Sequence, residues 1–303
     1  FYILLNSISD NLIEFALAKN IKINDFLSFV IIFSFFLFFI YFLYTILKMN
    51  IFDVIESADI YQNNFNELFS YFNGTPIDKI LKEINIFNNL NFVEIFSNFL
   101  NSITSFAGNF SMIIIFLIFL VIERNLFRTK IKKVINDKNK IKIFSNISKD
   151  IYSYFRIKTL TSFITGFLTF FFLYLNQSNL DIAFGILSFF LNFIPYIGSM
   201  LSILLPTIFV SIETLNFFQP MIIFFLLLLT HIFIGNFLEN KLMGKALNIS
   251  PIVLLIFLTL MGKIWGLSGM FLSVPILVVI LIVLKNFKQT KKIAILLSEK
   301  GNM

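Results

Sequence analysis

The chain contains 303 residues, of which 58% are hydrophobic and only 14% are charged, and its net charge is +7. A soluble domain is typically about 45–50% apolar and about 25% charged, so this composition does not suit a water-facing surface. The absence of cysteine excludes disulfides and cysteine-ligated metal sites, and the single histidine, His231, excludes a site with several histidine ligands. We therefore expect an all-α polytopic membrane helix bundle without a metal ion or cofactor.

Long uncharged runs mark the expected membrane spans. In chain order they cover residues 26–47, 95–122, 159–180, 182–212, 214–238, 246–262 and 264–284. A helix needs about 20 apolar residues to cross the hydrocarbon core, and nearly every run reaches that length. The chain begins with Phe1, and its first segment carries Asp10 and Glu14, which does not suit a signal peptide. We expect a fragment whose N-terminal part is missing.

The distribution of charge predicts the orientation. Residues 123–158 hold eleven basic and three acidic side chains, whereas residues 51–101 hold seven acidic side chains and two lysines. The positive-inside rule places the first segment in the cytoplasm and the second outside. The basic segment could bind nucleic acid, but a topology signal that is attracted to anionic lipid explains it more simply. We expect the lipid bilayer, and no nucleic acid, as its partner.

Both segments carry apolar stripes with helical spacing. We therefore expect a single transmembrane domain (1–303) that contains two helical insertions. Within the basic cytoplasmic segment 123–158, an apolar residue recurs every four positions from Ile143 to Phe155. This pattern predicts an amphipathic helix on the membrane surface. Within the extracytoplasmic insertion 48–101, a similar stripe ends at Phe72, and Pro76 then predicts the start of another helix.

Two apolar runs, residues 182–212 and 252–284, are too long for one comfortable crossing and too short for two. Each is broken near its middle, the first at Pro195 and Gly198 and the second at Gly262, Gly266 and Gly269. A break at membrane depth is tolerated only where the backbone is buried in protein or lines a wet cavity. We therefore predict two broken or re-entrant helical hairpins.

Counting the crossings supports this interpretation. The chain leaves the cytoplasm through residues 26–47, returns through 103–122, leaves through 159–175 and returns through 221–238. A single crossing at either broken run alone would place the basic residues at 285–292 outside, so we interpret both runs as hairpins. The hairpins enter from opposite faces, an arrangement typical of a transporter whose central site lies where they meet near the midplane.

Four stretches of this sequence resemble the autoinducer-2 exporter family, also described as PerM-type permeases. They are YFRIK (154–158), LNFIPYIG (191–198), ENKLMGK (239–245) and GLSGM (266–270). The resemblance covers roughly residues 19–287, without the further N-terminal hairpin that is usual in the family. Ser199 stands where the family commonly has proline.

The resemblance implies a multi-pass exporter or secondary transporter of a small polar signal, metabolite or ion in a prokaryotic inner membrane. It also implies homo-oligomers, and a proton or sodium gradient would drive such transport. A cation–proton antiporter and a non-transporting membrane scaffold are the alternatives. Gly266-Leu267-Ser268-Gly269 has the form found around the serine of rhomboid proteases, but His231 precedes that serine instead of following it. We do not expect an enzyme.

The expected transport path contains residues at the first break and at the two flanking helix ends. They are Asn192, Pro195, Tyr196, Gly198, Glu213, Glu239 and Asn240. Glu239 is the candidate protonatable group, and its alternative is an interface carboxylate that pairs with Lys241 or Lys245. Glu213 is more simply a solvated boundary residue, and His231 a satisfied packing residue. Lys263 could meet an anionic substrate or snorkel to the surface.

Overall fold

The computed structural model describes residues 2–21, 24–71, 138–243, 249–287 and 289–299, with Glu94, Asn98, Glu123, Leu126, Thr129 and Gly301. These described residues contain helices and no strand, which confirms the all-α prediction. The elements are α1 (Tyr2–Ala18), α2 (Asp25–Glu56), α3 (Ala58–Ser70), α7 (Lys138–Leu175), α8 (Asp181–Leu191), α9 (Ile197–Thr214), α10 (Phe218–His231), the π-helix η2 (Ile232–Glu239), α11 (Asn240–Met243), α12 (Pro251–Asn286) and α13 (Lys291–Leu297).

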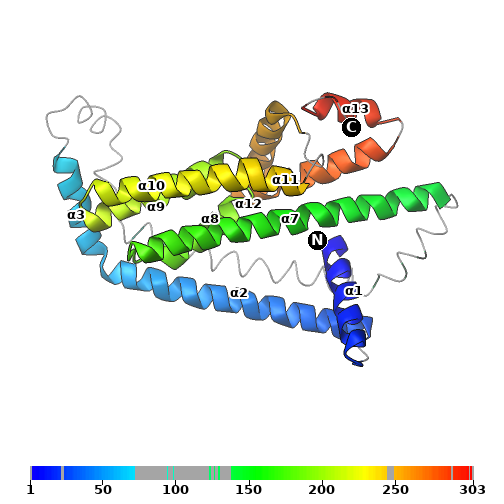
Figure 1. Cartoon of the computed structure of the whole chain (residues 1–303), viewed down its shortest axis with the longest axis horizontal. Coiled ribbons are helices and arrows are strands. Elements are labelled where there is room, and N and C mark those ends of the chain that lie inside the picture. Colours follow the sequence, from blue (N-terminus) through cyan, green and yellow to red (C-terminus); the bar gives the residue numbers. More distant parts are fainter. Residues whose placement is uncertain are drawn as a thin grey trace.

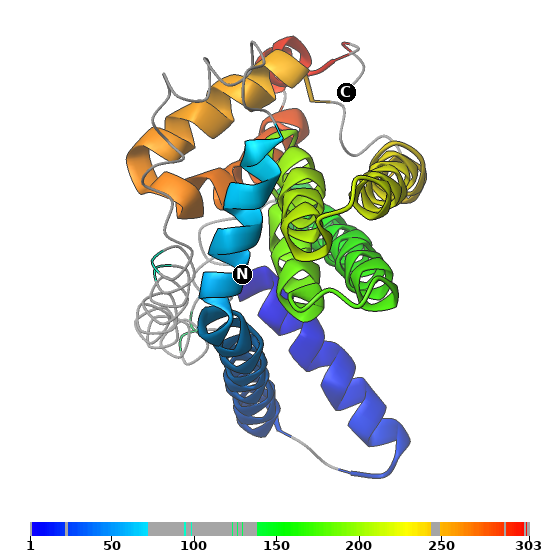
Figure 2. The same cartoon turned by 90° about the vertical axis from the view of Figure 1, so that its left-hand side faces the viewer.

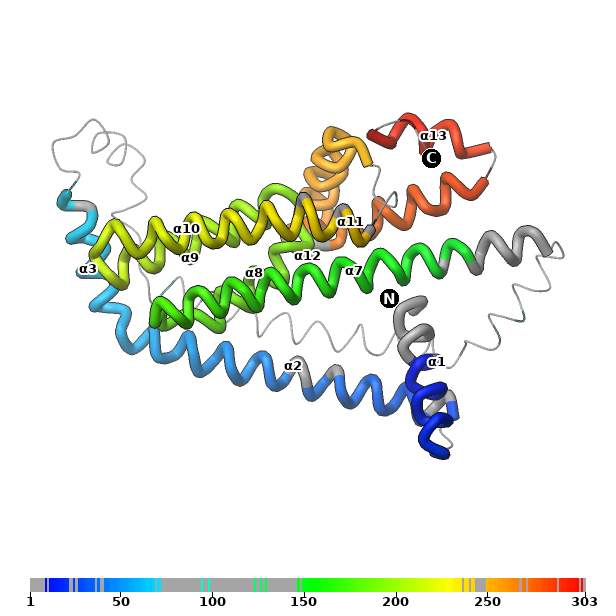
Figure 3. Tube along the Cα trace, viewed as in Figure 1, coloured from blue at the N-terminus to red at the C-terminus, as the bar shows by residue number. Residues whose placement is uncertain are grey.

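Three helical segments in the described part of the chain are long and apolar enough to cross a membrane. They are Lys149–Leu175 in α7, Ile197–Thr214 in α9, and Phe218–Glu239, which combines α10 and η2. Figure 1 shows α2, α7 and α10 extending along the long axis of the molecule, with the first half of α12 crossing that direction steeply. Figure 2 views the bundle nearly end-on, and Figure 3 follows the same path as a tube.

The predicted spans agree with the helices where the structure describes them. Residues 26–47 lie within α2, which continues to Glu56, and residues 221–238 lie within α10 and η2. The predicted crossing at 103–122 lies outside the described residues, as does the helix expected after Pro76. The first part of the 48–101 insertion is helical, because α3 packs its buried Tyr61 and Phe65 into a core shared with α8, α9 and α10.

The first predicted hairpin is formed by α8 and α9. The chain turns between Leu191 and Ile197, and the two helices pack on each other. At their open ends the backbone N–H of Asn179 donates to Oε1 of Glu213 at 2.8 Å. The chain therefore returns to the side from which it came.

The second predicted hairpin is α12, which bends at Gly266 into two arms, Pro251–Gly266 and Leu272–Asn286. Gly266 has φ 62° and ψ −142°, a backbone conformation that favours glycine because it has no Cβ. The arms approach each other closely, since a Cβ on Gly269 would collide with the carbonyl oxygen of Met261. At the open end, the backbone N–H of Ser250 donates to the carbonyl of Leu297 at 3.0 Å.

The apolar stripe at the start of α7 has a protein partner. Ile147 and Ile151 are buried in a cluster with residues of the second arm of α12, including Leu277 and Leu281. The position of this amphipathic helix on the membrane surface stays a prediction. Its apolar face is buried against α12, and the helix continues without a break into the span Lys149–Leu175.

Cysteine labelling of this naturally cysteine-free chain tests the two hairpins. We expect Gln177→Cys and Asn216→Cys to react with a membrane-impermeant maleimide from the same side, because α8 and α9 return to their starting side. Lys241→Cys and Lys291→Cys should react from the opposite side, because α12 also returns. Labelling after permeabilisation controls for reactivity. Reaction of Gln177→Cys and Asn216→Cys from opposite sides would contradict the first hairpin.

Candidate functional site

A buried ion pair joins α7 to the end of η2. Lys158 Nζ donates to both carboxylate oxygens of Glu239, at 2.8 and 3.0 Å, and the two side chains are only 10% and 13% exposed. The partners are 81 residues apart in sequence, so they meet only because α7 packs on η2. Together the two charges cancel, which lowers the cost of holding either one away from water.

The change in helix winding sets the direction of Glu239. The segment Phe218–Glu239 begins as an α-helix and becomes a π-helix after His231. A π-helix bonds each N–H to the fifth preceding residue, so its turns are wider and later side chains point in a different direction than in an α-helix. Such segments occur frequently at functional sites. Here the π-helix ends on the carboxylate that pairs with Lys158.

Two further polar side chains lie close to the ion pair. Tyr154, one turn before Lys158, is 3% exposed, and its hydroxyl has no hydrogen-bond partner among the described residues. Within the same described part, Nε2 of His231 is also buried without a partner. Tyr154 interacts electrostatically with Glu239, and His231 with Lys158. The prediction that His231 is a satisfied packing residue is therefore wrong.

The tip of the first hairpin reaches the same part of α7. Asn192 Nδ2 donates to Oγ of Ser162 at 3.0 Å, and Ser162 lies one helical turn after Lys158. Asn192, predicted from the break alone, is therefore about one turn from the ion pair. Sequence reasoning did not identify its partner, because the pattern of α7 does not show which residue the hairpin meets.

The break itself is a strained turn. Tyr196 has φ 60° and ψ −61°, and the backbone N–H of Ile197 donates to the carbonyl of Pro195 at 2.6 Å. These values describe the positive-φ form of the γ-turn, which is rare and strained. Gly198 is required next to it, because a Cβ there would collide with the carbonyl oxygen of Leu191. The surrounding structure must hold this turn in place.

The second hairpin reaches α7 on the other side of Lys158. Tyr154 belongs to the apolar cluster that contains Val274 and Leu277 of the second arm of α12. The two hairpins thus contact α7 at Tyr154 and Ser162, about 12 Å apart along the helix. In the described chain the main partners of α12 are α7 and α13, so the meeting of the two hairpins stays a prediction. Lys263 is exposed near the bend at Gly266.

The opposite end of the bundle holds a second polar cluster around Glu213. Besides the bond from Asn179 N–H to Glu213, Asn179 Nδ2 donates to the Tyr61 hydroxyl at 2.7 Å, and Asn50 Nδ2 donates to the Asn179 carbonyl at 2.9 Å. Burial raises the pKa of the Tyr61 phenol. Glu213 is half-buried and ties α9 to the turn before α8. Glu213 is therefore only partly solvated, and its position at a membrane boundary stays a prediction.

A line of buried threonines on α7 lies between the two polar ends. Thr161, Thr165 and Thr169 are fully buried, and each hydroxyl donates to a backbone carbonyl of the preceding turn at 3.0 Å. Each oxygen keeps acceptor capacity after this bond. The line spans about 12 Å from Thr161 to Thr169. Polar atoms therefore continue through the core of the bundle.

The sequence identified Glu239 but not its partner. Lys158 lies in the YFRIK stretch, where it looks like part of the basic segment. Of the partners expected for Glu239, Lys241 lies over the ring of Phe237 at 5.7 Å, and Lys245 is outside the described residues. Asn240 is the first residue of α11, directly after the carboxylate.

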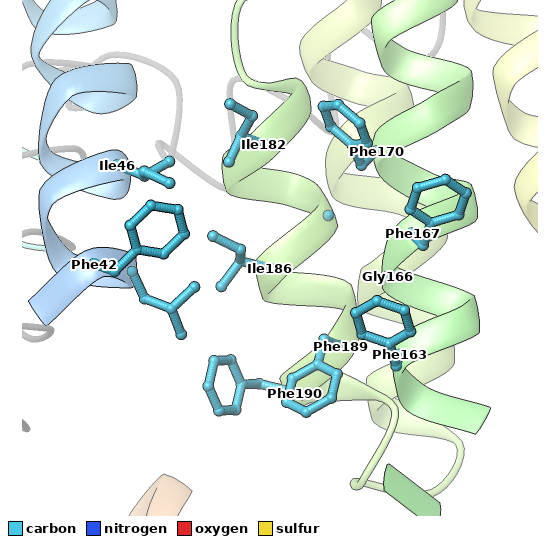
Figure 4. Close-up of a pocket in the computed structure, with 12 residues that line it drawn as sticks. Phe42, Ile46, Phe163, Gly166, Phe167, Phe170, Ile182, Ile186, Phe189 and Phe190 are labelled. Atoms are coloured by element: carbon cyan, nitrogen blue, oxygen red, sulfur yellow. The ribbon is translucent and has the colours of Figure 1, made fainter. Parts of the chain in front are cut away.

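A separate apolar groove lies between α2, α7 and α8. Its volume is about 410 Å³, and it is lined by apolar side chains together with Gly166 and Gly185. Figure 4 shows Phe42 and Ile46 of α2 opposite Ile186 of α8, with the ring of Phe167 farther along. A groove without polar groups does not suit a polar solute. We therefore assign the candidate site to the polar cluster of Tyr154, Lys158, Ser162, His231 and Glu239.

Comparison with known proteins identifies the family to which the chain belongs. The chain is 33% identical over 224 residues to a "Putative transport protein" of Borreliella burgdorferi. The aligned region covers 70% of this chain and 61% of that protein. It is 34% identical over 146 residues to "AI-2 transport protein TqsA" of Escherichia coli, covering 48% and 42% of the two chains. It is 34% identical over 149 residues to "Putative transport protein YhhT" of Escherichia coli, covering 49% and 42%.

The chain therefore spans between 42% and 61% of the length of these curated relatives. Their names describe transport proteins rather than enzymes, which agrees with the exclusion of a protease. The model of the AI-2E family transporters matches residues 1–289. The chain belongs to the AI-2E transporter family.

Proposed function

We propose that this chain moves a small polar signal, metabolite or ion across a bacterial inner membrane, driven by a proton or sodium gradient. The observation that carries the proposal is the Lys158–Glu239 pair, buried within the bundle one turn from the tip of a broken hairpin. Charged groups at membrane depth are costly and frequently mark the paths of ions or substrates. Broken helices that converge on such groups are typical of secondary transporters.

The proposed coupling group is Glu239. Its carboxylate can gain a proton or exchange its lysine partner for a sodium ion, and either event breaks the pair at 2.8 Å. Loss of the pair changes the contact between α7 and η2, and α7 also packs on α8 of the first hairpin. Binding at Glu239 can therefore favour one arrangement of the bundle over another.

The orientation of the proposed transporter follows from charge. The end of the bundle that holds Lys285 and the basic start of α7 faces the cytoplasm, and the end with Glu213 faces outward. Lys285 pairs with Asp150 at 2.9 Å at this basic end. The homo-oligomer expected for the family would form within the bilayer.

A cation–proton antiporter is the closest alternative, since the same carboxylate would bind both ions in turn. A non-transporting scaffold is less well supported. A scaffold is expected to pack its core without charge, whereas this core holds an ion pair, buried threonines and the buried hydroxyls of Ser188 and Ser202.

Flux in proteoliposomes with an imposed pH or sodium gradient tests the proposal. We expect a substrate screen to find gradient-driven flux, and we expect Glu239→Gln to remove its dependence on pH, because glutamine cannot take up the proton. Glu213→Gln is the matched control at the opposite end and should change the pH dependence less. Size-exclusion chromatography confirms that both variants are folded. Unchanged pH dependence in folded Glu239→Gln would remove this residue from the mechanism.

A further inference from the structure

The surroundings of Lys158 contain hydrogen-bond donors that are not fully used in this structure. The ammonium has three N–H groups, and Glu239 accepts from it with two oxygens. The hydroxyl of Tyr154 is buried without a partner in the described chain. Ser162 accepts from Asn192 Nδ2, which leaves its own O–H free to donate. Such a set of donors suits an anion.

The carboxylate that now fills this place belongs to the protein. Glu239 comes from the end of η2 and contacts Lys158 with both oxygens, as the carboxylate of a bound solute would. An internal carboxylate on a buried lysine keeps the site neutral while no solute is bound. The same arrangement makes Glu239 a competitor of any external carboxylate.

We propose that Lys158 binds the carboxylate of a small organic anion in the position that Glu239 occupies here, and that displaced Glu239 takes up one proton. This inference rests on the proposed transport function and names its substrate class. The hydroxyls of Tyr154 and Ser162 are the additional donors to the bound anion. No covalent bond changes other than the O–H bond formed at Glu239.

Charge balance is the reason for the proton. With Lys158 and ionised Glu239 the site has no net charge, and an incoming monocarboxylate alone would make it negative. Protonation of Glu239 by a proton from solution restores neutrality, which matters because an uncompensated buried charge is strongly destabilising. Among the described residues, the other titratable groups near the pair are Tyr154 on α7, His231 on α10 and the exposed Lys241 on α11. Each anion bound should therefore bring one proton.

The two hairpins provide the boundaries of the site. Asn192 at the tip of the first hairpin holds Ser162, and the second arm of α12 covers Tyr154. The strained γ-turn at Tyr196 lies four residues after Asn192. Movement of this tip would uncover Ser162 and Lys158 without unfolding α7.

Binding of acetate to the purified full chain in detergent tests the proposal without any transport measurement. In weakly buffered solution we expect acetate to bind wild type weakly and with uptake of about one proton per anion, measured as a rise in pH. Glu239→Gln should bind acetate about tenfold more tightly, because the internal competitor has lost its charge, and without proton uptake. Acetamide, the neutral analogue, should not bind either protein.

The double variant Lys158→Met/Glu239→Gln removes both charges and serves as the control. It should bind no acetate, and it remains informative if Glu239→Gln alone folds poorly, since it leaves no charge unpaired. If Glu239→Gln is unfolded without ligand, recovery of folded protein by acetate but not by acetamide supports the site. Acetate binding to the double variant as strong as to wild type would overturn the proposal. An equal rise in pH on addition of sodium chloride and of sodium acetate would also overturn the proposal.

These outcomes separate the inference from the function on which it rests. Gradient-driven flux together with no acetate binding would overturn the substrate class and leave the proposed transport intact. Acetate binding with proton uptake but no flux of any solute would support the site and contradict transport.

Discussion

Lys158→Ala is expected to lower the free energy of unfolding by about 3–5 kcal/mol, because it leaves the carboxylate of Glu239 buried without its counter-charge. The side chains of Lys158 and Glu239 are 10% and 13% exposed, so water cannot replace the lost partner without opening the bundle. The double variant Lys158→Met/Glu239→Leu should recover most of the stability, since apolar side chains of similar volume can replace a buried ion pair at little cost. Denaturant unfolding of the detergent-solubilised protein measures each difference.

The second ion pair of the described chain is the matched control. Lys285 and Asp150 lie 2.9 Å apart, but their side chains are 33% and 44% exposed. Lys285→Ala should therefore cost no more than about 1 kcal/mol, because solvent screens exposed pairs. If Lys158→Ala and Lys285→Ala lower the free energy of unfolding equally, the buried pair contributes no more to stability than the exposed pair.

Gly198→Ala is expected to destabilise the first hairpin by about 3 kcal/mol or more, because the added methyl group cannot be accommodated without moving backbone. The new Cβ would overlap the carbonyl oxygen of Leu191, and Ile194 lies 3.3 Å away on the same side. A backbone atom cannot rotate aside as a side chain can. The turn around Tyr196, already strained, would have to change.

Gly235→Ala provides the comparison for this variant. A Cβ at Gly235 meets nothing within 4 Å, although the residue also lies in a membrane-spanning helical segment. Alanine there should be neutral or stabilising by about 0.5–1 kcal/mol, because it reduces the freedom of the unfolded chain. Thermal unfolding of the two variants in the same detergent gives the contrast. A melting temperature of Gly198→Ala equal to that of wild type would contradict the close approach at the hairpin tip.

The helices and the two hairpins could be predicted from local sequence. Apolar length determined the spans, because a helix of fixed rise must cover a fixed thickness of hydrocarbon. Pro195, Gly198 and Gly266 marked the breaks, because proline removes a backbone donor and glycine permits conformations that other residues avoid. Charge at the ends of the chain then required an even number of crossings within the two broken runs.

The candidate site was predicted only in part. Glu239 and Asn192 were recognised beside helix ends and breaks, whereas Lys158, Ser162 and Tyr154 were not assigned a role. Lys158 belongs by composition to a basic segment, and its burial depends on η2, which lies 81 residues away in the chain. The partner of the Ile147–Ile151 stripe was also missed, since a stripe shows that a face is buried but not against which element.

The sequence by itself therefore determined that this chain is an all-α membrane protein with two broken hairpins, because helix length, breaks and charge asymmetry act locally. Only the tertiary structure decided that Lys158 meets Glu239 and that the two hairpins reach α7 on either side of this pair. The pairing requires α7 and the π-helix η2 to pack at one particular rotation and depth. That geometry follows from side-chain packing over the whole bundle, which no stretch of the sequence contains on its own.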